Sequence, residues 1–409
     1  MGKTLLAQGQ LSDALSHYHA AVEGDPDNYL TYFKRATVFL ALGKSRSALP
    51  DIDRVLELRP DFNAARLQRG NVYLKQGHLD EAETDFKKVL EYDAKNQQAK
   101  DSLQRIKPLK GNIAEAKDMF QNGDHQAAIE LLTKAIESCP WSPELKEMRA
   151  ECYIAQGDLF KAVLDIRPTT KLRNDNTAAY LKLSFLYYQL GEADESLNQI
   201  RECLKLDPDH KDCFTHYKIV KKLVKLLNSV QENINKNAYE ECINKANQIL
   251  KMEPTAQVFV LRAKSHLCHC NSKAGFDKEA IKKCSDVLKI DPNNVDALCD
   301  RGEAYIKASQ FNEAVKDYQQ AQGIDGESRR VQEGLEKAQK ILKQSNRRDY
   351  YKILGVRRNA DKRTIMKAYR KLAVKWHPDK YEKEEDKKKA QKHFIDIAAA
   401  KEVLTDPGK

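Results

Sequence analysis

The chain has 409 residues and is 41% hydrophobic and 32% charged, with only 17 Gly and 12 Pro. This length exceeds what one compact core usually organises, and the composition is typical of helices joined by short turns rather than of a β-rich domain. No apolar run approaches the roughly 20 residues that span a bilayer, so we expect no membrane insertion.

The positive charge is concentrated at one end of the chain. The formal net charge is +10. Residues 346–409 hold 19 Lys and Arg against 10 Asp and Glu, a net +9, which leaves +1 for the preceding 345 residues. A nucleic-acid-binding protein would distribute basic residues along its grooves. The concentration therefore favours an acidic protein partner for a small terminal module, and we expect no binding to nucleic acid.

Turns recur at a nearly constant spacing in the first 340 residues. Most steps between them are 34 residues, two are 46 and one is 38. Their central residues are Gly9, Gly43, Gly77, Gly123, Gly157, Gly191, Asn237, Gly275 and Ser309. Five residues after each turn lies a small side chain, which would let two helices approach closely. These small residues are Ala14, Ala48, Ala82, Ala128, Ala162, Ser196, Cys242, Ala280 and Ala314.

Proline marks the end of many of these units. It lies seventeen residues after the turn, where it would end the second helix, at Pro26, Pro60, Pro140, Pro208, Pro254 and Pro292. Such a unit of two helices resembles the tetratricopeptide repeat, which implies that helix pairs stack into a superhelix. We therefore expect an all-α fold, with nine repeats followed by a small helical module.

The two 46-residue steps divide the repeats into three groups of three. The expected groups are residues 1–106, 107–212 and 213–340. Met1 falls inside the first helix of the first repeat, so we expect that repeat to be truncated and the natural chain to start upstream.

The inserted residues predict three local features. The first insertion falls around residues 94–111, where Pro108 and Gly111 predict a break. Residues 211–236 contain neither Gly nor Pro and predict one long bridging helix. Four extra residues before Phe276 predict a longer turn.

The segment after residue 346 contains the most specific motif of the chain. The run Asp349-Tyr350-Tyr351-Lys352-Ile353-Leu354-Gly355-Val356 is followed by a basic amphipathic helix, by His377-Pro378-Asp379, and by a second apolar-faced helix. This order resembles the J domain of DnaJ-type proteins. Without the first motif, a basic helix and a proline turn would be an ordinary solvated surface. We assign residues 346–409 to a J domain and expect it to be truncated, because J domains usually continue into a fourth short helix.

The resemblance implies roles for individual residues. In J domains the basic helix docks on an acidic face of a DnaK-class chaperone, and His-Pro-Asp triggers ATP hydrolysis there. These roles fall on His377, Pro378 and Asp379, with Lys367, Arg370, Lys371 and Lys375 on the basic helix. Pro378 disfavours helical geometry at His377, so the tripeptide should lie on an exposed loop. No nucleophile neighbours His377 in the sequence, so we expect it to act as a contact rather than as a general base.

The first helices of such repeats line the concave face of the superhelix. In the first group the matching positions are apolar and predict a groove for unfolded chains: Leu6, Leu30, Phe33, Leu40, Leu67 and Leu74. Some of them could instead be interior packing. The second group has Lys110, Glu144, Glu147 and Glu151 there. The clamp that some tetratricopeptide proteins use for acidic chaperone tails needs two Asn, and only Asn71 fits, so we do not expect one.

The nine cysteines form no paired Cys-x-x-Cys units. We consider Cys203 with Cys213, and Cys268 with Cys284, as disulfide candidates, and free buried thiols as the alternative. A cluster of His and Cys superficially resembles a metal site, but its alternating spacing suits zinc poorly. Its members are His266, Cys268, His269, Cys270 and Cys284. We predict no metal and no cofactor.

Nine repeats followed by a J domain resemble the family of endoplasmic-reticulum-lumenal tetratricopeptide J-domain co-chaperones, also described as inhibitors of the kinases of translation initiation factor 2. The resemblance implies a lumenal setting, the DnaK-class partner BiP and misfolded client proteins. A cytoplasmic relative with the same two modules is the alternative location. The alternative function is a regulatory scaffold for one folded partner, such as a kinase of translation initiation factor 2. No catalytic constellation is apparent, so we do not expect an enzyme.

Overall fold

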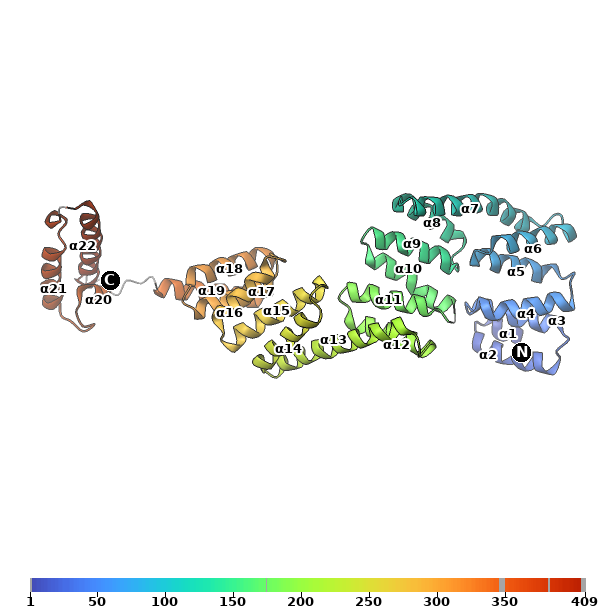
Figure 1. The fold of residues 1–409 in the computed structure, drawn as a ribbon, viewed down its shortest axis with the longest axis horizontal. Coiled ribbons are helices and arrows are strands. Elements are labelled where there is room, and N and C mark those ends of the chain that lie inside the picture. The colour runs from blue at the N-terminus through green and yellow to red at the C-terminus, as the bar shows by residue number, and fades with distance from the viewer. Residues whose placement is uncertain (1, 174, 346–349, 382, 406–409) are drawn as a thin grey trace. The chain divides into compact units, whose positions relative to one another are not determined.

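A computed structural model describes residues 2–173, 175–345, 350–381 and 383–405 of the chain. All regular elements in these residues are helices, which confirms the predicted all-α fold (Figure 1). None of the helices described there is long and apolar enough to cross a membrane. The chain divides into two compact units, Met1–Asn228 with Thr255–Phe259, and Ser229–Pro254 with Val260–Lys409.

Helices follow one another in pairs from the N-terminus. The first six are α1 (Gly2–Ala7), α2 (Leu11–Gly24), α3 (Tyr29–Ala41), α4 (Ser45–Leu58), α5 (Asn63–Gln76) and α6 (Leu79–Tyr92). The next six are α7 (Gln97–Gln121), α8 (His125–Ser138), α9 (Pro143–Ala155), α10 (Leu159–Leu172), α11 (Thr177–Gln189) and α12 (Ala193–Leu206). The two helices of each pair pack against each other, as α3 does with α4 and α11 with α12.

The remaining repeat helices continue this order. They are α13 (Lys211–Asn235), α14 (Tyr239–Met252), α15 (Gln257–Ala274), α16 (Asp277–Leu288), α17 (Val295–Lys307) and α18 (Phe311–Ile324), and α19 (Arg329–Ser345) packs on α17 and α18. Several second helices end two residues before a proline, as α4 does before Pro60 and α12 before Pro208. The division into groups at residues 1–106, 107–212 and 213–340, and the count of nine repeats, stay predictions.

The turn within each helix pair has the same backbone geometry. All nine predicted turn residues have positive φ, including Asn237 at 57° and Ser309 at 61°. Glycine adopts this region without a steric penalty, and asparagine tolerates it better than most residues. The small residue five positions later is fully buried in every pair, for example Ala82 and Cys242 at 0% exposure. The predicted turns and helix crossings are therefore confirmed.

Four helix pairs contain a buried ion pair that the sequence analysis missed. An Arg eight residues before the turn binds an Asp eight residues after it, so the two lie 16 residues apart. Arg149, for example, donates two hydrogen bonds of 2.7 Å to the two oxygens of Asp165. The four pairs are Arg35–Asp51, Arg69–Asp85, Arg149–Asp165 and Arg301–Asp317. Bidentate geometry of this kind fixes the two helices of a repeat against each other.

The helix that crosses the first insertion is continuous. The predicted break at Pro108 and Gly111 is wrong, because α7 runs through both residues. Ile106 and Leu109 are buried on either side of the proline, and α7 packs against α6 and α8. A proline inside a helix costs about 3 kcal/mol, which burial of two or three apolar side chains offsets.

The other two insertions also form helix. The long bridging helix is confirmed, since α13 covers Lys211–Asn235. The longer turn before Phe276 is wrong, because the four extra residues lengthen α15 to 18 residues instead. Four residues are close to one helical turn, so the buried face of α15 keeps its direction.

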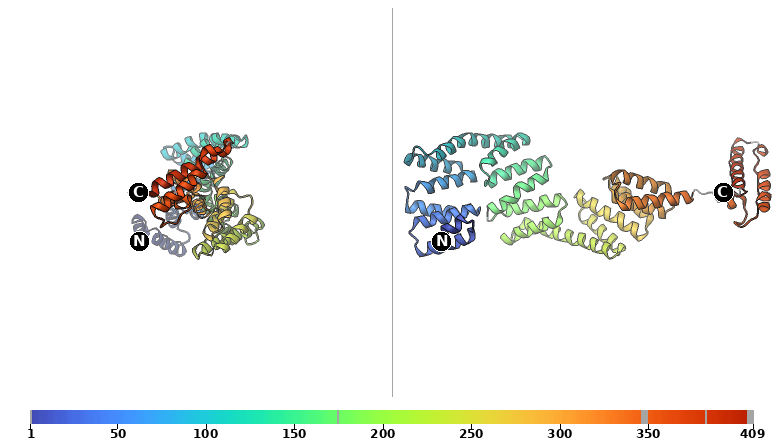
Figure 2. Two further views of the ribbon diagram at one scale, coloured as in Figure 1. Left: turned by 90° about the vertical axis from the view of Figure 1, so that its left-hand side faces the viewer. Right: turned by 180° about the vertical axis from the view of Figure 1, so that it is seen from behind.

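The C-terminal module consists of α20 (Tyr350–Leu354), α21 (Lys362–Lys375), the short 3₁₀ helix η1 (Pro378–Lys380) and α22 (Glu384–Thr405). Helices α21 and α22 pack side by side, as Figures 1 and 2 both show. Its core contains four buried residues from all three α-helices, Leu354, Ile365, Ile397 and Ala400. Residues 346–349 and 406–409 of the predicted module lie outside the described residues.

Candidate functional site

The tripeptide His377-Pro378-Asp379 lies on the connection between α21 and α22, and its two polar side chains are exposed. His377 has extended backbone angles, φ −65° and ψ 125°, as expected for a residue before proline. The helix therefore ends at Lys375 and the chain turns at η1. The side chains of His377 and Asp379 are 49% and 83% exposed.

Aromatic contacts hold this connection in place. The ring of Tyr381 stacks on Trp376 with 6.2 Å between centroids, and its hydroxyl donates to the Lys375 carbonyl at 3.2 Å. The ring of His377 contacts Phe394 of α22 edge to face at 5.5 Å. The tripeptide is thus presented to solvent on a support that both long helices contribute to.

Within the tripeptide, His377 Nδ1 accepts a hydrogen bond from the Asp379 amide at 3.4 Å. The same nitrogen lies 3.4 Å from a carboxylate oxygen of Asp379, a contact that becomes an ion pair when the ring is protonated. Pro378 has no amide hydrogen and fixes its own φ, which limits the conformations open to the loop. These contacts favour one presentation of the His and Asp side chains.

The helix before the loop is basic on its outer face. Asp361 caps its first turn by accepting from the Thr364 amide at 3.1 Å. The Thr364 side chain and this amide together lower the pKa of the Asp361 carboxyl below its usual value. Ile365 is buried in the module core. The predicted docking residues are all exposed, and none makes an ion pair with any residue that the structure describes: Lys367, Arg370, Lys371 and Lys375. This unneutralised surface can attract an acidic partner.

The predicted apolar groove is partly used for packing. Leu30 is 41% exposed, whereas Leu6, Phe33, Leu40, Leu67 and Leu74 are half-buried. Phe33 packs edge to face on Phe62 at 5.1 Å. The half-buried five contact three different core clusters, so each contributes to the fold and keeps part of its surface accessible.

The matching positions of the second group are ion-paired. Lys110 binds Asp80 and Glu83 at 2.6 Å each, and with Lys87 it lowers the pKa of Glu83 to about 2. The other three side chains also bind residues of neighbouring elements: Glu144 binds Arg173, Glu147 accepts from Asn176, and Glu151 binds Lys182. These charges therefore neutralise one another between repeats.

Three disulfides link the later helices. The structure joins the two predicted pairs, Cys203–Cys213 and Cys268–Cys284, and a third pair that the sequence analysis did not propose, Cys242–Cys270. The sulfurs of the cluster considered as a metal site thus belong to disulfides. Three cysteines stay free and buried, Cys139, Cys152 and Cys299, and burial raises the pKa of Cys139 and of Cys299 to about 11. Such thiols are poor nucleophiles.

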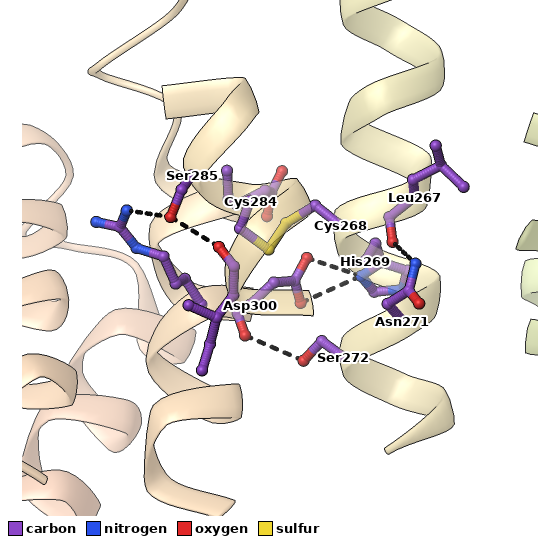
Figure 3. Close-up of a disulfide and its surroundings, with 12 residues drawn as sticks. Leu267, Cys268, His269, Asn271, Ser272, Cys284, Ser285 and Asp300 are labelled. Carbon is purple, nitrogen blue, oxygen red and sulfur yellow. Dashed lines mark hydrogen bonds and ion pairs between the residues drawn. A yellow bond between two sulfur atoms is a disulfide. The ribbon is translucent and has the colours of Figure 1, made fainter. Parts of the chain in front are cut away.

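A polar cluster lies beside the Cys268–Cys284 disulfide (Figure 3). His269 Nδ1 lies 3.0 Å from the buried carboxylate of Asp300, and Ser272 donates to the Asp300 carbonyl at 3.0 Å. Arg330 from α19 binds the same carboxylate at 2.6 Å. Burial raises the Asp300 pKa, but the His269 hydrogen bond and the Arg330 charge outweigh it, so the pKa lies below its usual value. This cluster connects α15, α17 and α19.

Comparison with known proteins covers both parts of the chain. The DnaJ domain model matches residues 349–409, and tetratricopeptide-repeat models match residues 33–99, 119–164, 177–210 and 283–316. DnaJ homolog subfamily C member 3 from Bos taurus is 55% identical over 100% of this chain and 81% of its own length. The Homo sapiens protein of that name is 54% identical with the same coverage. A crystal structure of the P58(IPK) TPR domain, 50% identical, matches 85% of this chain and 98% of its own with a TM-score of 0.77.

Proposed function

Because the chain belongs to the family of DnaJ homolog subfamily C member 3, co-chaperones that join tetratricopeptide repeats to a J domain, we propose that it brings unfolded clients to a DnaK-class chaperone and stimulates the ATPase of that chaperone. The contacts that trigger hydrolysis would come from His377, Pro378 and Asp379. The exposure of this tripeptide is the observation that carries the proposal.

The basic helix would supply attraction and orientation. Lys367, Arg370, Lys371 and Lys375 lie on the helix that leads directly into the loop, so an acidic surface docked on α21 would bring the partner to His377. Charged contacts of this kind increase the association rate and weaken with salt. The residues of this chain would act by binding, and the chemistry of ATP hydrolysis would belong to the partner.

The repeats would hold the client. The proposed surface is the half-exposed apolar set on α1, α3 and α5: Leu6, Leu30, Phe33, Leu40, Leu67 and Leu74. Unfolded chains expose apolar side chains that these residues can cover, and each buried side chain contributes about 1–3 kcal/mol. Clients would be recognised by apolar content rather than by one sequence.

We further propose a setting in the lumen of the endoplasmic reticulum, with BiP as the chaperone. Three disulfides support an oxidising compartment, because cytosolic thiols are normally kept reduced. Non-reducing peptide mapping of protein isolated from cells tests this setting. Recovery of all six cysteines as free thiols would argue for the cytoplasm.

The central experiment replaces His377 by Gln in the full chain and measures single-turnover ATP hydrolysis by BiP. Stimulation should be lost while binding of an unfolded client by the repeats is unchanged. His17→Gln, at an exposed histidine of the repeats, is the matched control and should keep its stimulation. Unchanged stimulation by His377→Gln would remove the proposed mechanism.

A second measurement separates a general co-chaperone from a scaffold for one folded partner, such as a kinase of translation initiation factor 2. The parent chain and its His377→Gln variant are both tested for suppression of the aggregation of several unrelated unfolded proteins. Suppression of all of them supports the co-chaperone. Binding to a single folded kinase, with no effect on unfolded proteins, would favour the scaffold.

A further inference from the structure

A pocket of about 540 Å³ lies within the first compact unit, and the described residues of its wall include none of the apolar groove residues. The start of α4, the start of α9 and the end of α10 all contribute to its wall. Six lining residues carry its chemistry: Lys44, Arg46, Lys171, Arg173, Trp141 and Leu49. We call it the basic pocket.

Three of its cations are unneutralised. Lys44, Arg46 and Lys171 are exposed, and none forms an ion pair or a hydrogen bond from its side chain to any residue that the structure describes. Arg173 is different, because Glu144, which also lines the pocket, binds it. Elsewhere in this unit basic side chains often bind acidic ones, as Lys110 binds Glu83. Three unpaired cations around one hollow therefore give it a positive potential.

The cations come from two separate elements. Lys44 and Arg46 stand at the start of α4, where the helix dipole adds partial positive charge, and the cap residue makes no side-chain hydrogen bond to the helix. Lys171 stands in the last turn of α10. Cations that line one pocket from two elements suit a chain with several carboxylates.

An apolar wall stands between the cations. Trp141 is half-buried, its amide donates to the Lys75 carbonyl at 2.9 Å, and the Lys75 ammonium lies 4.8 Å from its ring centroid. These contacts fix the indole in place. Leu49 and Leu172 add further half-buried apolar surface to the lining.

We propose that the basic pocket binds an acidic peptide segment of a partner protein, with carboxylates on Lys44, Arg46 and Lys171 and one apolar side chain against Trp141. The proposal goes beyond the co-chaperone function, because neither the loop at His377 nor the apolar groove is involved. Such a segment is charged, whereas the clients proposed above are recognised by their apolar side chains. The chain would thus have a second binding mode, selective for charge.

The test uses the full chain with Trp376→Phe, which leaves Trp141 as the only tryptophan of the two in the sequence. The probe is a fluorescein-labelled twelve-residue peptide of alternating Asp, Leu and Glu, followed by fluorescence anisotropy and by Trp141 emission. Binding should change both signals and weaken about tenfold or more between 50 and 300 mM salt, because several charge contacts are screened together. The same peptide with Asn and Gln in place of Asp and Glu should not bind.

Charge reversal identifies the site. Lys44→Glu with Arg46→Glu, and separately Lys171→Glu, should lower the affinity at least tenfold. The matched control, Lys88→Glu with Lys134→Glu, reverses two exposed lysines of the same unit outside the pocket and should bind as the parent does. Circular dichroism checks that every variant folds.

Three results would overturn the proposal. They are no anisotropy change with the acidic peptide, equal binding of its Asn and Gln analogue, and equal loss of affinity in the control variant, which would mean attraction by overall charge alone. Stimulation of the chaperone ATPase is measured in parallel with chains that keep Trp376, because this ring supports the His377 loop. It should be unaffected by Lys44→Glu with Arg46→Glu, so failure of this proposal is distinguishable from failure of the co-chaperone function.

Discussion

The first repeats carry apolar side chains at positions where the later repeats carry charged ones. In α3 and α5 the positions expected to face the groove are Leu30, Phe33 and Leu74, which keep part of their apolar surface accessible. In α7 and α9 the matching positions are Lys110 and Glu151, and each is bound by a charged residue about 30 positions away.

The same pattern of charges continues in the last repeats. Lys273 binds Glu303 at 2.6 Å, and Arg330 binds Asp300 and Glu303. A charged groove of this kind has its own partners from the next repeat and gains little by binding an apolar chain. An apolar groove has no such partner, so it is the surface that we propose for the client. One repeat architecture can therefore carry accessible apolar side chains in some repeats and paired charges in others.

The largest effect should come from the ion pairs inside repeats. Arg149→Met leaves the carboxylate of Asp165 buried without its partner, which should lower the free energy of unfolding by about 3–5 kcal/mol. Arg173→Met removes a half-exposed pair between repeats and should cost less than about 1 kcal/mol. Urea unfolding of both variants measures the contrast.

A second change checks the cause of that effect. Arg149→Met combined with Asp165→Leu removes both charges and should recover most of the lost stability. If Arg149→Met costs no more than Arg173→Met, the distinction between pairs inside and between repeats fails.

Covalent links should give the next largest effect, and they lie in the later repeats. Replacing Cys268 and Cys284 together by Ala should lower the free energy of unfolding by about 2–4 kcal/mol, since the loop they close spans 16 residues. Replacement of Cys139 and Cys152, which are free, should cost about 1–2 kcal/mol through lost packing only. The measurement is urea unfolding under non-reducing conditions. An unchanged unfolding midpoint in the first variant would show that this disulfide does not constrain the repeat.

Substitutions in the proposed groove test the difference between the first and the later repeats. Phe33→Ser and Leu74→Ser should each weaken capture of an unfolded protein about tenfold, because each removes one apolar contact worth about 1.5 kcal/mol. Leu30→Ser should act similarly with little loss of stability, because this side chain is the most exposed of the set. Glu144→Gln and Glu151→Gln, in the charged part, should bind normally. Equal loss in both sets would remove the assignment of the groove to the first repeats.

The smallest effect concerns pH and the last repeats. Burial, assisted by the charges of Arg262 and His269, lowers the pKa of His266 to about 4 from 6.5. Between these values the unfolded chain binds a proton that the folded chain does not, so stability should fall as pH drops from 6.5 toward 4. The change should not exceed about 1–2 kcal/mol, because the ring is only half-buried. Urea unfolding midpoints at pH 7 and pH 5 measure this change in stability. The His266→Gln variant should lose the pH dependence. A parent protein whose midpoint does not change between these pH values would contradict the prediction.

The turn geometry could be read from the sequence because it depends on local chemistry. Spacing alone identified Asn237 and Ser309 as turn residues, and both adopt positive φ. The His377 loop was also predictable, since proline restricts the residue before it. By contrast, the helix through Pro108 depends on tertiary packing on both of its sides, which no local rule contains.

Two further features were not predicted, the Arg–Asp pairs and one disulfide, and for different reasons. The Arg–Asp pairs could have been found, because Arg149 and Asp165 stand at equal distances on either side of their turn, as do the members of the other three pairs. The pairing of Cys242 with Cys270 could not, because it depends on how α14 and α15 pack.

The 16-residue spacing of the Arg–Asp pairs has a consequence for gene duplication. A duplicated 34-residue segment that starts before the first helix contains both the Arg and the Asp, so the new copy can form its own ion pair at once. The pairs between repeats are split by the same event, because their members lie about 30 residues apart in different copies. Arrays of this kind can therefore lengthen by copying whole units first, and refine the contacts between copies by later point substitutions.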